Sequence, residues 1–477
     1  MKALLVVMAL ALGAAVWWLS PAQGPTALLM TAVLAAGPLY LISRSRSADK
    51  EFLLQIFIAA LLARLGVGTL IYVSNGQGFF GGDAYQYDYF GNELLMVWRG
   101  WNLRTAAAVT GEVSGYGMLY IVAAIYAVVG RNMLAVQFFN AVLGACTVPL
   151  LYLCTLQIYG STRVARAAAA CVAFFPSLVL WSAQGLKDGP IVFLLVVTML
   201  MTLRVGEKLR AGYALGLAAS LLCLLTFRFY IFYMVAAAAG GALLIGMRKV
   251  STRALAQQLA VLLGVGLMLT YFGVIRTAQE HFDTYGTLEK VQQTREYFAK
   301  SAKSGFGEDL DVSTAEGALT AIPLGMLYLL FAPFPWQLGS LRQTITLPEM
   351  VVWWASFPLL CLGVWFTLRH RLRQALPIII FTAMLTLAYS IFQGNVGTAY
   401  RQRSQLLVFY FIFVAVGFVL MKEGREDKRR GEAKAREAER AQLRAPRRPG
   451  TRLPMVQGGR VASAAQVGPA ADIPPRI

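Results

Sequence analysis

Charged residues are scarce in this chain: Asp, Glu, Lys and Arg make up 14% of its 477 residues. Soluble domains carry about a quarter of their residues charged, so the composition excludes a string of ordinary soluble domains. Hydrophobic residues instead make up 57%, and apolar runs near the ~20 residues needed to span a bilayer recur along the sequence. The composition therefore predicts an all-α polytopic membrane protein.

Histidine, cysteine and the common cofactor motifs are sparse as well. The two histidines, His281 and His370, are far apart in the sequence, which argues against a histidine-rich metal site and a Ser-His-Asp triad. The five cysteines all fall in apolar segments and are expected to be small buried hydrophobes. No glycine-rich phosphate loop, His-Glu-x-x-His or paired-cysteine motif occurs, which argues against a nucleotide-driven pump. The sequence indicates neither a resident metal nor an organic cofactor.

The net charge of +19 does not point to a nucleic-acid partner, because of how the charge is distributed. Lysine and arginine cluster at the ends of apolar segments and in the C-terminal tail. Positive-inside insertion produces this pattern in membrane proteins. Membrane lipid is the expected partner, and the basic tail either contacts anionic headgroups or only fixes the topology.

Twelve apolar segments are predicted to cross the membrane. The first resembles a signal peptide, but a second apolar run follows directly, so we predict a retained anchor. The predicted spans are residues 3–19, 26–42, 52–73, 133–157, 167–183, 190–204, 212–226, 230–246, 259–275, 349–368, 376–392 and 405–421.

Two further apolar stretches, 116–130 and 319–336, are predicted to be juxtamembrane or re-entrant. Glycines precede the first and prolines interrupt the second, and irregular backbone survives at membrane depth only beside protein or a wet cavity. With twelve crossings, every short basic connection and both termini face the cytoplasm of a bacterial-type cell, across its inner membrane. Large outer loops are then expected at 74–132 and 276–348.

This topology divides the chain into a transmembrane region, residues 1–421, and a basic cytoplasmic tail, residues 422–477. Alternating Lys, Arg, Glu and Ala up to about Arg444 predict a solvated helix. The Pro, Gly and Arg content beyond Ala445 predicts disorder.

The first outer loop places a carboxylate close to the membrane surface. Asp83 follows two glycines, and residues 84–98 are expected to form an amphipathic interfacial helix that carries Tyr85 and Asp88. A carboxylate here can accept a proton from an acceptor hydroxyl, so Asp83 is the candidate general base and Asp88 a second carboxylate candidate. The alternative is a solvated loop in which Asp83 caps the helix.

Several cations from distant parts of the sequence fall on the outer side of the predicted topology, where short connections normally avoid positive charge. Together they would suit the phosphate of a lipid headgroup. Some would alternatively lie at helix ends with their charge in water, and Lys187 would alternatively pair with Asp188. A further arginine, Arg64, lies within a predicted span and is expected to bond to polar neighbours or carbonyls there. The candidate phosphate ligands are Arg131, Lys187, Arg228, Arg401 and Arg403.

The order and spacing of these features resemble the GT-C superfamily of polyprenyl-phosphate-sugar-dependent glycosyltransferases, especially its ArnT-like and protein O-mannosyltransferase-like branch. The resemblance is good over about residues 50–230 and loose elsewhere. The residues that carry it are Gly82-Asp83, Arg131, Val148-Pro149-Leu150, Tyr152, Tyr159 to Arg166, Phe175-Pro176-Ser177, Trp181-Ser182 and Lys187-Asp188.

The resemblance implies that Asp83 is the base that activates the acceptor, that Arg131 lies near the lipid phosphate, and that 116–130 is juxtamembrane. This chain departs from branches with two consecutive acids, because Ala84 follows Asp83. It also has no sizeable soluble C-terminal region, so acceptor contacts are expected from loops and the helix bundle.

The function expected from the sequence is transfer of a sugar from a polyprenyl phosphate or diphosphate carrier to a glycan or lipid acceptor, at the outer face of the inner membrane. Other envelope-biosynthesis proteins are conceivable partners. An enzymatic alternative is an O-antigen ligase or polymerase, which would depend on Arg401 and Arg403 more than on Asp83. A non-enzymatic alternative is a lipid-linked sugar flippase, which would need charges along an internal path; only Arg64 is clearly intramembrane.

Overall fold

The computed structural model describes residues 2–80, 82–101, 116–208, 210–245, 263–271, 274, 286–300, 304–307 and 310–444. These residues form helices and connecting turns, and no β-strand occurs among them beyond one isolated bridge between Gly305 and Asn395. The predicted all-α class is confirmed.

The helices follow the apolar segments of the sequence closely. They are α1 (Lys2–Leu19), α2 (Gly24–Arg44), α3 (Lys50–Val73), α4 (Gln77–Phe80), α5 (Asp83–Trp98), α7 (Gly117–Val129), α8 (Met133–Tyr159), α9 (Thr162–Phe174), α10 (Pro176–Ser182), α11 (Asp188–Glu207), α12 (Ala211–Phe227), α13 (Phe229–Ile245), α16 (Leu288–Lys300), α17 (Ala315–Phe331), α18 (Leu341–His370), α19 (Leu372–Phe392), α20 (Val396–Gln402) and α21 (Ser404–Arg444).

In the described part of the chain, eight helices are long and apolar enough to cross a membrane, or nine if α9 and α10 form one bent span. This confirms a polytopic membrane protein. The helices α12 and α13 are shorter, at 17 residues each, and the predicted span 259–275 is described only at residues 263–271 and 274. The two stretches predicted not to span form the short helices α7 and α17, of 13 and 17 residues.

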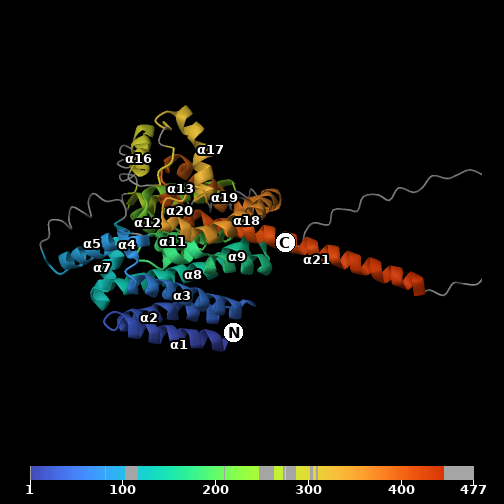
Figure 1. The fold of residues 1–477 in the computed structure, drawn as a ribbon, viewed down its shortest axis with the longest axis horizontal. Helices are drawn as coiled ribbons and strands as arrows, with labels where there is room; N and C mark the ends of the chain where they lie inside the picture. The colour runs from blue at the N-terminus through green and yellow to red at the C-terminus, as the bar shows by residue number, and fades with distance from the viewer. Residues whose placement is uncertain are drawn as a thin grey trace, which may run out of the picture.

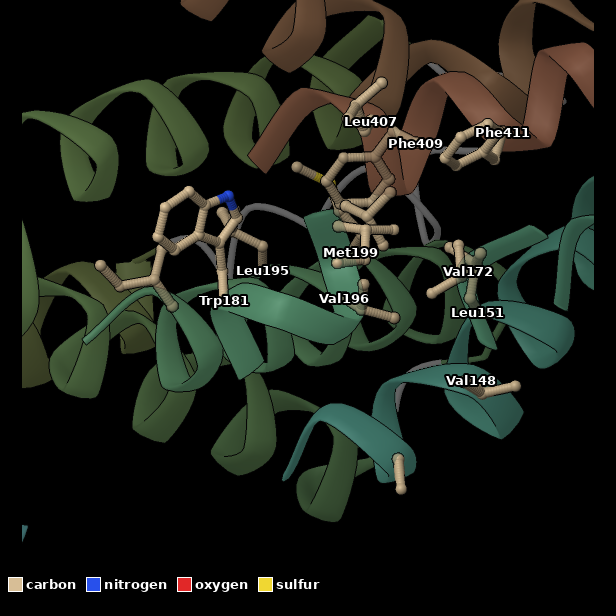
Figure 2. Packing of buried hydrophobic residues seen from close by; sticks show 14 of the residues in the cluster. Val148, Leu151, Val172, Trp181, Leu195, Val196, Met199, Leu407, Phe409 and Phe411 are labelled. Atoms are coloured by element: carbon tan, nitrogen blue, oxygen red, sulfur yellow. The ribbon is translucent and has the colours of Figure 1, made fainter. Parts of the chain in front are cut away.

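The bundle is built on a core shared by α3, α8, α9, α11 and α21, which pack against one another (Figure 1). Figure 2 shows Val148 and Leu151 of α8, Val196 and Met199 of α11, and Phe409 of α21 among the buried side chains of this core. Burying apolar surface between the helices holds together elements that are far apart in sequence.

The helix α21 leaves the bundle as one unbroken helix and projects away from it (Figure 1). Its first part is buried, and most residues from Glu423 to Ala438 are exposed and charged or small. The predicted solvated helix is thus a direct continuation of the predicted span 405–421. Residues 445–477, predicted to be disordered, lie outside the described residues.

One predicted span, 167–183, is broken in the structure. The helices α9 and α10 meet at an angle of 57°. The break occurs because Pro176 has no N–H to donate to the carbonyl of Val172. Arg64 of α3 supplies donors instead: its guanidinium donates to the carbonyls of Val172 at 3.1 Å and Ala173 at 3.0 Å, and to Ser182 Oγ at 2.8 Å. Arg64 is buried and stabilises this bend.

Candidate functional site

A cavity of about 1230 Å³ opens between α3, α10, α18 and α20. We call it the Asp83 cavity. One part of its wall is apolar, with Ala63, Val67, Phe174 and Val179. The other part is highly charged. Its charged lining residues are Asp83, Lys187, Arg228, Arg342, Glu349 and Arg401.

Asp83 reaches this cavity because it is the first residue of α5. The chain leaves α3 at Val73 and makes the short helix α4 before α5 begins. A carboxylate in the first turn of a helix is stabilised by the N-terminal end of the helix dipole. The side chain of Asp83 keeps 47% of its surface exposed, so a ligand in the cavity can approach it.

Tyr87 lies one turn after Asp83, on the same side of α5. Burial, followed by the nearby charge of Asp83, raises the pKa of the Tyr87 phenol above its usual value. Tyr87 was not among the site residues predicted from the sequence. It could have been predicted from its spacing, because residues four apart on a helix lie on the same face and Tyr87 follows Asp83 by four.

Arg401 of α20 connects two carboxylates from distant parts of the chain. Its Nη1 donates to Asp83 Oδ2 at 2.7 Å, and its Nε donates to Asp188 Oδ2 at 2.7 Å. Burial opposes the charge of Arg401, but Asp188 and Asp83 outweigh it and raise the pKa of the guanidinium. The guanidinium also lies over the ring of Trp181, 5.8 Å from its centroid. Arg401 is therefore a fixed cation.

Asp188 is fully buried and contacts a second arginine on its other side. Arg228, between α12 and α13, places Nη2 3.5 Å from Asp188 Oδ1 and donates from Nη1 to Tyr230 Oη at 2.7 Å. Asp188 thus holds Arg228 and Arg401 together at one end of the cavity. Asp188 therefore forms ion pairs with the two arginines, and the alternative predicted pair of Lys187 with Asp188 does not occur.

Lys187 lines the same cavity and forms no ion pair with any described residue. Burial, and after it the nearby charge of Arg228, lowers the pKa of Lys187 to about 8, while Asp188 opposes the change. A partly buried cation without a carboxylate of its own is a suitable ligand for an anion that enters the cavity.

The segment that carries Lys187 and Asp188 is fixed by the core. Asn140 of α8 donates from Nδ2 to the carbonyls of Gln184 at 2.6 Å and Leu186 at 2.7 Å. A Cβ at Gly189 would lie 3.4 Å from the Cα of Ser182, so the start of α11 sits close to the end of α10. The bend stabilised by Arg64 and this bonding together place the two charged residues.

The helix α18 adds two charged residues that the sequence analysis missed. Arg342 and Glu349 are seven residues apart, which places them on one face of the helix, toward the cavity. Arg342 donates to the carbonyl of Gly78 at 3.3 Å, and Glu349 accepts from Tyr400 Oη at 2.9 Å. Their spacing of seven residues could have predicted a shared helix face. It was missed because α18 begins at Leu341, whereas the predicted span 349–368 leaves Arg342 outside the helix.

Two of the predicted phosphate ligands do not line the Asp83 cavity. Arg403 is 1% exposed; it donates to the carbonyl of Ala332 and lies 3.1 Å from Met350 Sδ. Arg131 forms an ion pair with Asp88, and Tyr126 Oη also donates to Asp88. Both guanidinium groups are thus already bonded to other protein groups, and neither faces the Asp83 cavity.

Arg131, Asp88 and Tyr85 line a second cavity, of about 480 Å³, which we call the Asp88 cavity. It lies on the other side of α5 from the Asp83 cavity: Asp83 and Asp88 are about 140° apart around a helix of 3.6 residues per turn. Its remaining lining residues are Leu19, Gln23, Tyr72, Val73, Asn75, Gln77 and Met133.

Among the described residues, no group of three or more His, Cys, Asp or Glu side chains is arranged to hold a metal ion. At the Asp83 cavity, ion pairs instead connect carboxylates and cations alternately, in the order Asp83, Arg401, Asp188, Arg228.

Residues 115–275, about a third of the chain, match the family described as Dolichyl-phosphate-mannose-protein mannosyltransferase. The chain resembles the GT-C glycosyltransferases. The matched residues of this GT-C-like chain include Arg131, Lys187, Asp188 and Arg228, whereas Asp83 and Arg401 lie outside them. No curated protein matches the chain.

Solved structures similar to the chain include ArnT from Cupriavidus metallidurans bound to undecaprenyl phosphate, at 14% identity and a TM-score of 0.41, covering 64% of this chain and 49% of that one. The Archaeoglobus fulgidus oligosaccharyltransferase in its apo form matches at 13% identity and a TM-score of 0.43, covering 80% and 52%. AglB of the same organism, in complex with an inhibitory peptide and a dolichol-phosphate, matches at 13% and 0.43, covering 81% and 52%. The chain spans about half the length of these structures.

Proposed function

We propose that this protein is a membrane glycosyltransferase that moves a sugar from a polyprenyl phosphate or diphosphate carrier to a hydroxyl acceptor. The observation that carries the proposal is the combination in one cavity of a half-exposed carboxylate, Asp83, with Lys187, a partly buried cation that has no described ion-pair partner. The family match over residues 115–275 supports the same chemistry.

In the proposed reaction, the acceptor O–H bond breaks and its proton passes to Asp83. The acceptor oxygen forms a bond to the anomeric carbon as the bond from that carbon to the phosphate oxygen breaks. The phosphate leaves with the electron pair, and Lys187, Arg228 and Arg401 stabilise its negative charge. A single displacement of this kind inverts the anomeric configuration.

The two parts of the Asp83 cavity suit the two parts of such a donor. The charged part would bind the phosphate, and the apolar part, lined by Ala63, Val67, Phe174 and Val179, would contact the polyprenyl chain. We place this site at the outer face of a bacterial inner membrane with both termini in the cytoplasm, because that topology keeps the short basic connections inside.

Part of the predicted outer loop 276–348 packs at the rim of the Asp83 cavity. Ser304 lines the cavity, and Phe306 N–H donates to the carbonyl of Gly394 at 2.8 Å, next to the start of α20. We propose that this contact helps to exclude water from the reaction, as closed loops do in other enzymes. Residues 275–285 of the same segment lie outside the described residues.

The test is transfer from radiolabelled polyprenyl-linked sugars in membranes that contain equal amounts of wild-type protein or Asp83→Asn. Loss of a general base costs about 10²–10⁴-fold in rate, so transfer by the variant should fall by that much. Asp311→Asn is the matched control: this carboxylate is exposed, lines neither cavity and should leave transfer unchanged.

Full activity of Asp83→Asn would remove Asp83 from the mechanism and favour an arginine-based ligase or polymerase that depends on Arg401. If wild-type membranes fail to transfer any of the polyprenyl-linked sugars while binding them, the flippase alternative is favoured.

A further inference from the structure

The Asp88 cavity is a feature of the described residues that the proposed reaction does not use. Its lining combines two aromatic side chains, Tyr72 and Tyr85, with the polar side chains of Asn75, Gln77 and Asp88. Arg131 completes it. We infer that this cavity binds a neutral sugar unit of the acceptor; its assignment to the acceptor rests on the proposed function.

Charge distinguishes this cavity from the first one. Arg131 and Asp88 are the charged groups among the described residues that line it, and each neutralises the other: Arg131 Nε lies 3.3 Å from Asp88 Oδ1, and Nη2 bonds to Oδ2. A phosphate would have to compete with Asp88 for Arg131 and would meet the Asp88 charge. The cavity therefore favours a ligand without net charge.

The chemistry of the lining favours a hydroxylated ring among neutral ligands. A sugar ring presents many hydroxyl groups and one apolar face. Arg131 keeps 54% of its side-chain surface exposed and Asp88 keeps 15%, so donors and an acceptor remain within reach of a ligand. Tyr85, which is 45% exposed, offers an aromatic face for the apolar side of the ring.

The position of the cavity also suits an acceptor. Asp83 and Asp88 lie on opposite sides of α5, and five residues of helix separate them by about 7.5 Å along its axis. An acceptor that binds in the Asp88 cavity could present its hydroxyl to Asp83 across the start of the same helix. The Asp88 carboxylate is fixed for this role by Tyr126 of α7, which donates to Oδ1.

The experiment measures binding of a panel of neutral di- to hexasaccharides to detergent-solubilised protein by saturation-transfer NMR. Tyr85→Ala removes the aromatic face and should weaken binding of the oligosaccharides by about tenfold. The matched control is Tyr89→Ala: Tyr89 lies one turn later on α5, is 54% exposed and lines neither cavity, so binding should stay at the wild-type level.

A second variant separates a binding role of Arg131 from a structural one. Arg131→Gln should weaken oligosaccharide binding while the affinity for a bare polyprenyl phosphate, measured in the same sample, stays unchanged. Intact phosphate binding then shows that the variant is folded.

Three results would overturn the inference: no oligosaccharide of the panel binds wild-type protein that binds polyprenyl phosphate, Tyr85→Ala and Tyr89→Ala behave alike, or Arg131→Gln weakens binding of the phosphate lipid. A wild-type protein that binds oligosaccharide but no polyprenyl phosphate would instead contradict the proposed function and support this site as a sugar site.

Discussion

The two cavities on either side of α5 both contain arginine and aspartate but arrange their charges differently. In the Asp88 cavity, one arginine and one carboxylate pair with each other. In the Asp83 cavity, four cations line the wall together with two carboxylates, and Lys187 forms no ion pair with a described residue. An arginine near a membrane surface is therefore not enough to predict a phosphate site. The cavity around the arginine must also contain more positive than negative side chains.

Burial adds to this difference. Asp188 is 1% exposed and lies between Arg228 and Arg401, which fixes both guanidinium groups before any ligand binds. Arg131, in contrast, is half exposed at the edge of its cavity. Charges fixed in a dry site stabilise a transition state more than exposed ones do, because no reorganisation is needed during the reaction.

The largest difference in affinity for polyprenyl phosphate is expected between two variants, each of which replaces the arginine of one cavity by glutamine. Arg401→Gln leaves Asp188 and Asp83 without their shared partner, and affinity for polyprenyl phosphate should fall by about a hundredfold. Arg131→Gln should leave that affinity unchanged. Equilibrium binding of a radiolabelled polyprenyl phosphate to both variants checks this. Equal losses in the two variants would remove the distinction between the cavities.

A smaller effect is expected from Arg64, which stabilises the bend that precedes Lys187 and Asp188. Arg64→Met leaves the carbonyls of Val172 and Ala173 without donors, at about 1–3 kcal/mol for each buried group. The unfolding temperature should fall, and the remaining folded protein should lose phosphate-lipid affinity but keep oligosaccharide affinity.

Lys2→Met is the control for Arg64→Met, because Lys2 pairs with Glu51 at the surface, where both side chains are exposed. Its unfolding temperature should equal that of the wild type. If Arg64→Met unfolds at the wild-type temperature as well, the bend does not depend on Arg64.

The smallest expected effect is a pH dependence confined to one cavity. Burial lowers the pKa of Lys187 to about 8, so this side chain is positive below pH 8 and becomes neutral as the pH rises through that value. A phosphate binds the positive form, so affinity for polyprenyl phosphate should fall as the pH rises through 8, by about tenfold in total once Lys187 is neutral. Lys187→Arg stays charged and should remove this dependence.

Binding titrations between pH 7 and pH 10 check the prediction for Lys187. Oligosaccharide binding at the Asp88 cavity should not change over the lower half of this range. A wild-type affinity for polyprenyl phosphate that is constant up to pH 10 would show that Lys187 does not contact the phosphate.

Much of the fold could be predicted from the sequence, because long apolar runs leave few alternatives to a membrane-embedded helix. The break between α9 and α10 was missed, although Pro176 signals it, because a hydropathy pattern does not show where a helix bends. The start of α18 was also placed too late: its first turn carries Arg342 and Gln343, whose polarity resembles that of a loop.

Part of the candidate site could also be predicted from the sequence, from the positions of its charged residues rather than from apolar runs. Lys187, Arg228 and Arg401 were predicted because they run against the usual charge pattern of outer connections, and Asp83 because it is a carboxylate near the membrane surface. The fold brings all four to one cavity. The sequence could not show that Arg131 faces the other side of α5. That depends on the rotation of one helix, which tertiary packing sets.

The most direct test of the account is to locate the lipid phosphate. A polyprenyl phosphate analogue with a photoreactive group beside its phosphate would be crosslinked to the protein in membranes, and the labelled peptides identified by mass spectrometry. We predict label on the segments that carry Lys187 and Arg401, and loss of that label in Arg401→Gln. Label concentrated instead around Tyr85, Asp88 and Arg131 would contradict the central claim that the charge surplus of the Asp83 cavity binds the phosphate.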